Sequence, residues 1–221
     1  MTIIAVSMLL AALPNRTNTI IIHQQRQAFA QASDNNKNNY SFRTYENPAY
    51  GIQIQYPSTW IIYAGDVFSD NDYDDDDAAI DIVSFLGPVK SDTEAYAPSL
   101  YISIDNPPTS DLNLNLTEYL ARITDDYDAR LKDFKVIESN TNSSILASKP
   151  AYKLVFTEEE DEIHYKTMEI GTIIGDKVYL LSYAAQEEQY SDYLPTVQKM
   201  IDSFKITTSN NGLDNEASFS A

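Results

Sequence analysis

Hydrophobic and polar residues alternate along much of the chain, which is typical of β-strands with one buried and one solvent-facing side. Ile52, Ile54 and Tyr56 alternate with two glutamines, so the apolar side chains share one face. Further segments with β-prone composition cover residues 61–68, 80–86, 99–105, 134–139, 149–157, 163–174 and 177–185. Gly175-Asp176 between the last two predicts a two-residue hairpin turn.

The stretch FRTYENPAYGIQIQYPSTW, residues 42–60, predicts the hairpin that opens the fold. Pro48 fixes φ and Gly51 permits a positive φ, so the chain reverses between them. Pro57 ends the second strand because proline cannot donate to a β-ladder. Trp60 follows the turn, and we expect it to be buried against the sheet. The stretch therefore predicts structure rather than a ligand-binding motif.

Two segments instead have apolar residues at helical spacing. Residues 116–131 and 187–204 each carry an apolar stripe along one face. Asn115 before the first segment, with Glu118 three residues later, predicts a capping box. Pro195 either starts the second helix or kinks it. Antiparallel strands with two amphipathic helices predict an α+β domain whose sheet is covered by helices.

The N-terminal segment has features of an export signal. Residues 3–13 are an apolar run of signal-peptide length, and Ala28, Ala30 and Ala32 give an A-x-A cleavage pattern. No Lys or Arg precedes the run, and the alternatives are an uncleaved anchor broken by Asn15 and Arg16 or a misplaced start codon. The predicted organisation is a signal peptide or N-terminal anchor (1–32), a linker (33–41), a folded domain (42–206) and a disordered tail (207–221).

The composition and net charge of the chain limit the classes of molecule that it can bind. The 221 residues suit one domain, and 15 basic against 33 acidic residues give a net charge of −18. Such a surface repels phosphate backbones and anionic lipids, so we expect no nucleic-acid partner and membrane contact only through the N-terminal segment. The chain has no cysteine, which excludes disulfides and thiolate metal sites. Its six scattered glycines exclude a G-x-G-x-x-G fingerprint and a P-loop.

The acidic run SDNDYDDDD, residues 69–77, is the candidate metal site. Its predicted ligands for Ca²⁺ are Asp70, Asp72, Asp74, Asp75, Asp76 and Asp77, because a hard cation takes six to eight oxygen ligands. The run is not an EF-hand, since Asp75 stands where that loop needs glycine and Asp81 where it needs glutamate. The alternative is a solvated acidic loop that binds cations weakly.

Other polar residues carry weaker indications of chemistry. The second acidic run, TEEEDE at 157–162, predicts a soluble hairpin loop, or a partner of the first run at one cation site. His164, the only histidine after residue 32, is predicted to be an exposed strand residue. A catalytic triad would have to use it, and the chain has no G-x-S-x-G motif. Many of the sixteen tyrosines, including Tyr56, Tyr152 and Tyr190, are expected in the core, and exposed ones could form a protein-binding face.

Five segments resemble the PsbP-type domains, the family of the extrinsic photosystem II subunit and its relatives. They are YENPAYGIQIQYPSTW (45–60), LTEYL (116–120), LASKPAYKLVFT (146–157), and GDKVYLLSYAA with YLPTVQKMIDSF (175–185 and 193–204). The resemblance covers roughly residues 42–206, and it is closer to the stand-alone exported PsbP-like proteins of prokaryotes than to the chloroplast subunit. Ser148 departs from the pattern, because the family usually has glycine there.

The resemblance implies the Mog1/PsbP architecture, a central and mainly antiparallel sheet flanked by helices in an αβα sandwich. It also implies a non-enzymatic accessory protein, although the net charge of −18 opposes docking through basic residues. We therefore expect an exported module at the cell surface that acts through a protein partner and binds Ca²⁺ through the acidic run. The alternatives are a metal-independent interaction module of the Mog1 kind and a carboxylate-based hydrolase.

Overall fold

The computed structural model describes residues 41–64, 79–89, 97–107 and 115–207. The predicted leader, most of the linker and all but the first residue of the tail lie outside these ranges. In chain order the elements are β1 (Phe42–Asn47), β2 (Ile52–Pro57), β3 (Ile61–Ala64), β4 (Ile80–Leu86), β5 (Ser99–Asp105), α2 (Leu116–Arg130), β6 (Lys135–Leu146), β7 (Lys149–Glu160), β8 (Ile163–Ile174), β9 (Lys177–Gln186), α3 (Glu187–Ser203) and β10 (Lys205–Ile206).

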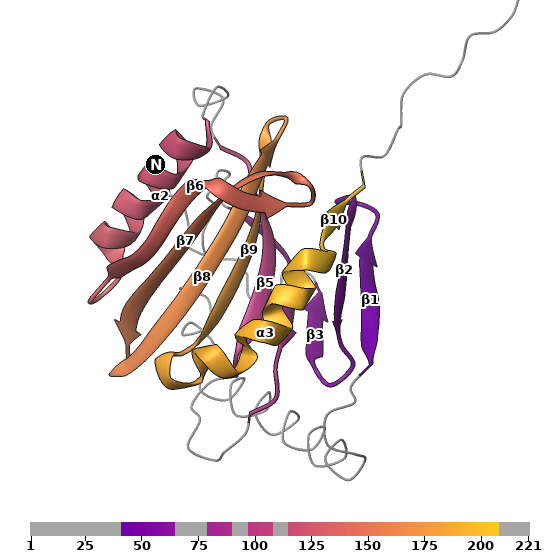
Figure 1. Cartoon of the computed structure of the whole chain (residues 1–221), viewed down its shortest axis with the longest axis horizontal. Helices are drawn as coiled ribbons and strands as arrows, with labels where there is room; N and C mark the ends of the chain where they lie inside the picture. Colours follow the sequence, from indigo (N-terminus) through magenta and orange to yellow (C-terminus); the bar gives the residue numbers. More distant parts are fainter. Residues whose placement is uncertain (1–40, 65–78, 90–96, 108–114, 208–221) are drawn as a thin grey trace, which may run out of the picture.

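The described strands form two antiparallel sheets (Figure 1). The larger has seven strands in the order β3-β4-β5-β9-β8-β7-β6, and every neighbouring pair runs antiparallel. The smaller has three strands in the order β1-β2-β10. The α+β fold predicted from the alternating pattern is therefore confirmed.

Helices α2 and α3 pack on opposite faces of the seven-stranded sheet. Helix α2 joins one apolar cluster with Tyr152 and Leu154 of β7, whereas α3 joins another with Val155 of β7. Because successive side chains of a strand point to opposite faces, these contacts place the helices on either side. The small sheet packs into the same cluster as α3 (Figure 1). The helix–sheet–helix arrangement is as predicted, with the small sheet sharing the layer of α3.

The opening hairpin forms the small sheet rather than an edge of the large one. Strand β10, which the sequence did not predict, pairs with β2 directly after α3 ends. The Thr207 N–H then donates to the Gly51 carbonyl at 2.6 Å. A side chain at Gly51 would collide with the Thr207 carbonyl, and its φ of +63° also suits glycine. Gly51 therefore serves both the turn and the contact with the chain end.

Several local predictions are confirmed. Asn115 and Glu118 form the capping box of α2, and Trp60 is buried with its ring 6.4 Å from that of Tyr193. The tyrosines predicted to face the core, Tyr56, Tyr152 and Tyr190, are buried. Pro195 lies inside α3, so it does not start that helix.

Two predicted boundaries are wrong. Strand β6 continues to Leu146, although its second half is rich in Asn and Ser, and β7 continues through most of the predicted acidic loop. Only Asp161 and Glu162 form the turn, because Glu158 to Glu160 pair with β8. Cross-strand pairing along the long hairpin thus overrides the local preference of these polar residues.

Candidate functional site

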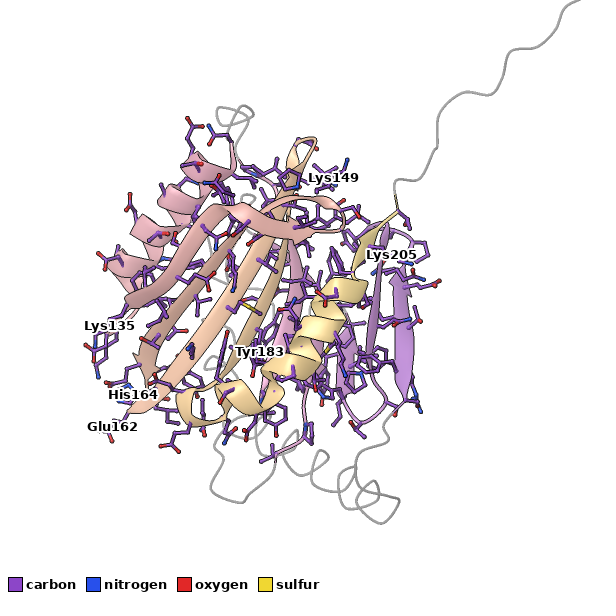
Figure 2. The ribbon with its side chains drawn as sticks, in the orientation of Figure 1. Lys135, Lys149, Glu162, His164, Tyr183 and Lys205 are labelled. Carbon is purple, nitrogen blue, oxygen red and sulfur yellow. The ribbon has the colours of Figure 1, made fainter. Side chains whose placement is uncertain are left out.

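The predicted metal ligands Asp70, Asp72, Asp74, Asp75, Asp76 and Asp77 all lie outside the described residues. Within the described ranges, no group of three or more acidic or histidine side chains could hold a metal ion. His164 is exposed as predicted and lies with Glu162 at one end of the sheet (Figure 2). His164, Lys166 and Met168 are each two residues apart in β8, so they point to the same face of the sheet. Met168 packs in the cluster that contains α3, so His164 faces the α3 side.

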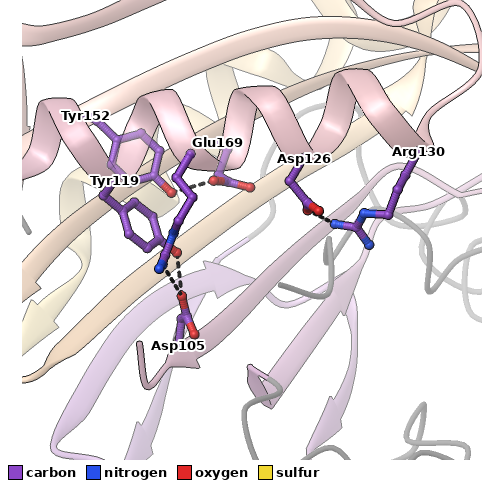
Figure 3. Close-up of polar contacts among 7 residues, drawn as sticks. Asp105, Tyr119, Asp126, Arg130, Tyr152 and Glu169 are labelled. Carbon is purple, nitrogen blue, oxygen red and sulfur yellow. Dashed lines mark hydrogen bonds and ion pairs between the residues drawn. The ribbon is translucent and has the colours of Figure 1, made fainter. Parts of the chain in front are cut away.

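A cluster of buried polar side chains lies beneath α2. The Tyr127 hydroxyl donates to Glu169 Oε2 at 2.8 Å, and the Tyr152 hydroxyl donates to Oε1 of the same carboxylate. The Tyr119 hydroxyl donates to Asp105 Oδ2 at 2.8 Å (Figure 3). All five side chains are buried. Hydroxyl–carboxylate hydrogen bonds therefore connect α2 to β5 and β8, in addition to apolar packing.

The sequence positions these groups through helical and strand periodicity. Tyr119, Ile123 and Tyr127 are four residues apart, so they share the face of α2 that meets the sheet. Gly171 makes room for the Tyr152 ring, because a methyl group there would lie 2.7 Å from Tyr152 Cζ. The ring can then reach Glu169 on the next strand.

Burial dominates the electrostatics of the cluster. It raises the pKa of Glu169, an effect reinforced by the charge of Asp105 and opposed by the two tyrosine hydrogen bonds. Burial and the nearby carboxylates raise the pKa of Tyr119, Tyr127 and Tyr152 well above the usual value. These phenols therefore remain protonated donors.

Arg122 supplies positive charge to this region from α2. Its Nη2 lies 3.9 Å from Asp105 Oδ2, and its guanidinium carbon lies 5.2 Å from the centre of the Tyr119 ring. On the next turns of α2, Arg130 pairs with Asp126 (Figure 3). Arg122 thus neutralises part of the acidic charge of the sheet, whereas Arg130 neutralises a carboxylate of α2 itself.

The same side of the sheet carries a wider set of polar residues, here called the polar face. It consists of Ser84, Ser99, Tyr101, Ser103, Asp105, Thr167, Glu169 and Ser182, all of them buried. The pairings Ser84–Tyr101, Tyr101–Ser182 and Ser182–Glu169 align one row of them across four strands. The opposite face of the same strands presents Ile102, Leu181 and Met168 to the apolar core.

Among the residues that the structure describes, two hydroxyls of the polar face have no hydrogen-bond partner. They are Ser103 Oγ and Thr167 Oγ1, and both side chains are fully buried. An unsatisfied buried polar group costs about 1–3 kcal/mol, so it needs an explanation in a native fold. Helix α2 packs mainly over β7 and β6, at one side of these hydroxyls. The polar face thus combines small side chains, hydroxyl groups and carboxylate acceptors in a buried layer.

Sequence reasoning missed this face, although β5 contained a signal for it. In SLYISID the leucine and isoleucines alternate with Ser99, Tyr101, Ser103 and Asp105. A strand buried on both sides, with one side polar, indicates a second interior environment rather than a solvent-exposed face. Glu169 gave a similar signal inside the apolar strand β8.

The protein has one seven-stranded and one three-stranded antiparallel sheet, and α2 and α3 lie on opposite faces of the larger one. This arrangement is that of the Mog1/PsbP-like class of α+β fold. The solution structure of the cyanobacterial PsbP protein, CyanoP, from Synechocystis sp. PCC 6803 is similar, with a TM-score of 0.53 and 15% sequence identity, covering 76% of this chain and 94% of that chain. This confirms that the domain has a PsbP-like fold.

A second solved structure with this fold is LpqN of Mycobacterium tuberculosis. Its TM-score is 0.51 at 10% identity, covering 77% of this chain and 92% of that chain. No protein-family model matches the sequence, and no curated protein matches it. In the part of the chain that the structure describes, no helix is long and apolar enough to cross a membrane.

Proposed function

We propose that this protein is an exported accessory module that acts by binding rather than by catalysis. The PsbP-like fold supports the proposal, and so does the description of LpqN as involved in cell envelope biogenesis. The single observation that carries the binding role is the pair of buried, unpartnered hydroxyls of Ser103 and Thr167 on the polar face. A small polar ligand that bonds them would remove the cost of burying them.

Thr167→Val tests this role, because valine keeps the shape and removes the hydroxyl. We expect protein isolated from its own cells to carry an additional mass in native mass spectrometry and to melt higher than the same protein after unfolding, dialysis and refolding. The variant should lose both the mass and the difference in melting temperature.

Thr172→Val is the matched control. Thr172 Oγ1 donates to the Pro150 carbonyl at 2.7 Å, and the residue faces the α3 side, so this variant should lose stability yet keep the additional mass. If wild-type protein as isolated and after refolding has one mass and one melting temperature, the polar face holds no ligand beyond water.

Calcium binding through residues 69–77 is the second part of the proposal. Six carboxylates in eight residues, in a chain of net charge −18, favour a hard divalent cation. Thermal unfolding with millimolar Ca²⁺ or Mg²⁺ at fixed ionic strength tests it. A ligand at a hundredfold excess over its Kd stabilises the native state by about 2.7 kcal/mol. Ca²⁺ should raise the melting temperature more than Mg²⁺ does. This increase should disappear when Asp70, Asp72, Asp74, Asp75, Asp76 and Asp77 are replaced by Asn. Equal increases with the two cations would indicate a solvated loop.

A metal-independent interaction module is the alternative function. It is favoured by Val136 and Ile137, which are 42% and 58% exposed on the edge strand β6. In that case the protein partner binds this end of β6, and Ile137→Ser weakens a complex isolated from the native cells without changing the response to Ca²⁺. Asp176→Ser, at the β8–β9 turn, is the control and should leave the complex intact.

A further inference from the structure

Two N-x-S/T sequences in the described structure lie side by side at one end of α2. Asn115-Leu116-Thr117 starts the helix, and Asn142-Ser143-Ser144 lies in β6. Residues of both sequences line one open groove of about 620 Å³, to which Glu118 and Thr141 also contribute. The Thr117 and Thr141 hydroxyls are 3.4 Å apart. Such a sequence is the acceptor for N-glycosylation when it lies on the surface of an exported protein.

The backbone around Asn142 projects from the sheet. Asn140 pairs with Lys153 and Ser144 pairs with Ala151, so three residues of β6 lie opposite the single residue Tyr152 of β7. Asn142 is exposed, and its carboxamide makes no hydrogen bond to the described residues. The bulge therefore presents a free amide nitrogen on an edge strand.

The neighbouring asparagines are engaged in hydrogen bonds. Asn140 Oδ1 accepts from the Ser143 and Ser144 hydroxyls at 3.2 and 3.0 Å. Asn115 Oδ1 accepts from the backbone N–H groups of Thr117 and Glu118, both at 3.0 Å. A transferase that needs an extended acceptor would have to open the first turn of α2 to use Asn115. In the folded protein Asn142 is thus the accessible acceptor.

Apart from the bulge, the stretch of β6 around Asn142 has no charged side chains to protect it as a sheet edge. Residues 139–148 contain no charged side chain, although 33 acidic and 15 basic residues occur in the chain. Ile145 within this stretch is 70% exposed, and β6 is the last strand of the seven-stranded sheet. Open edges with exposed apolar residues associate with other chains unless charges, bulges or a cover prevent it. A large hydrophilic group at the bulge would supply that cover.

We propose that Asn142 is N-glycosylated and that the glycan shields the β6 edge. In this step Asn142 Nδ2 attacks the anomeric carbon of an oligosaccharide activated as a polyprenyl phosphate or pyrophosphate. A carbon–nitrogen bond forms, the bond from the anomeric carbon to the phosphate oxygen breaks, the lipid phosphate leaves, and one amide proton is released to the transferase base. The step goes beyond the proposed function but rests on the export that it includes, and it requires the transferase and the activated donor on the exporting face of a membrane.

The test is peptide mass spectrometry on protein recovered from the native cells and fractionated by compartment. We expect the peptide containing Asn142 to carry a glycan mass that is lost in Asn142→Gln and in Ser144→Ala. Asn140→Gln and Asn115→Asp are the controls and should keep it, since aspartate still caps α2. Exported protein with an unmodified Asn142 would overturn the inference while leaving export intact.

A second measurement tests the shielding role. In size-exclusion chromatography coupled to light scattering, Asn142→Gln should form larger species at concentrations where the glycosylated protein stays monomeric. Adding Ile145→Lys should restore the monomer by placing a charge on the edge. A glycosylated protein whose association is unchanged by Asn142→Gln would show that the glycan does not protect this strand.

Discussion

Ser148 occupies a backbone conformation that suits glycine better than serine. In the β6–β7 turn, Ala147 and Ser148 have φ angles of 50° and 63°. Positive φ at both central residues is the feature of type I′ hairpin turns, which favour Asn-Gly. The position where the sequence departs from the PsbP-type pattern is thus one where a side chain is strained.

We expect Ser148→Gly to raise the free energy of unfolding by about 1 kcal/mol, because glycine has no Cβ to clash in the left-handed region. The melting temperature should rise by roughly 2–4 °C in a domain of this size. Ser148→Ala keeps the Cβ and should change little. A loss of stability in the glycine variant would contradict the assignment of strain.

Glu158 links stability to pH. It is 8% exposed near the end of β7, and burial, with a smaller contribution from the charge of Glu160, raises its pKa from 4.5 to about 7. The folded state therefore holds this proton more tightly than the unfolded state. The contribution of Glu158 to stability is complete below pH 4.5 and is lost as the pH rises to about 7.

We therefore expect Glu158→Gln to be more stable than the wild type at pH 8, by roughly 1–3 kcal/mol, and to converge with it near pH 4. Urea denaturation at several pH values measures the difference. Glu162→Gln is the control, because it removes an exposed charge from the neighbouring turn. Parallel curves for the wild type and Glu158→Gln would be inconsistent with a buried carboxyl.

Elements with strong local signals could be predicted from the sequence. The capping box of α2 and the Gly175-Asp176 turn are both present because short-range chemistry fixes them. The second half of β6 and the two-residue strand β10 could not be predicted, because β6 forms by pairing with β7 and β10 by pairing with β2. Their residues carry no alternation long enough to reveal it.

The cap of α2 gives a prediction at this scale. Asn115→Ala should lower the free energy of unfolding by about 1 kcal/mol, because the N–H groups of Thr117 and Glu118 lose their acceptor. Asn115→Asp keeps an acceptor and should retain most of the stability. Equal losses in the two variants, measured by urea denaturation, would mean that the cap does not stabilise the helix.

The whole molecule combines a regular fold with a strong acidic charge. Sequence reasoning found the fold class, but the polar face joins β4, β5, β8 and β9 with side chains of α2. Which strands become neighbours depends on the non-local pairing of β5 with β9, which no local pattern encodes. The site was therefore less predictable than the elements that build it.

A net charge of −18 destabilises a compact state through self-repulsion. We expect the melting temperature to rise by several degrees between low salt and about 0.5 M NaCl, since the screening length falls from roughly 30 Å at 0.01 M to well below 10 Å. Tetramethylammonium chloride should act like NaCl, because screening does not depend on the cation. A melting temperature that falls with salt would show that attractive ion pairs outweigh the repulsion.

The pairing of β5 with β9 also determines when the large sheet can be completed during synthesis. Strands β6 to β9 follow one another as hairpins and can pair as soon as each has been made. Strand β5 emerges before all of them and can pair with β4, yet its second partner, β9, is the last strand of the large sheet to be synthesised. The edge of β5 that pairs with β9 therefore stays unpaired until most of the chain has left the ribosome. A nascent chain stalled before Lys177 can form one partial sheet from β3 to β5 and another from β6 to β8, but without β9 the two cannot be joined.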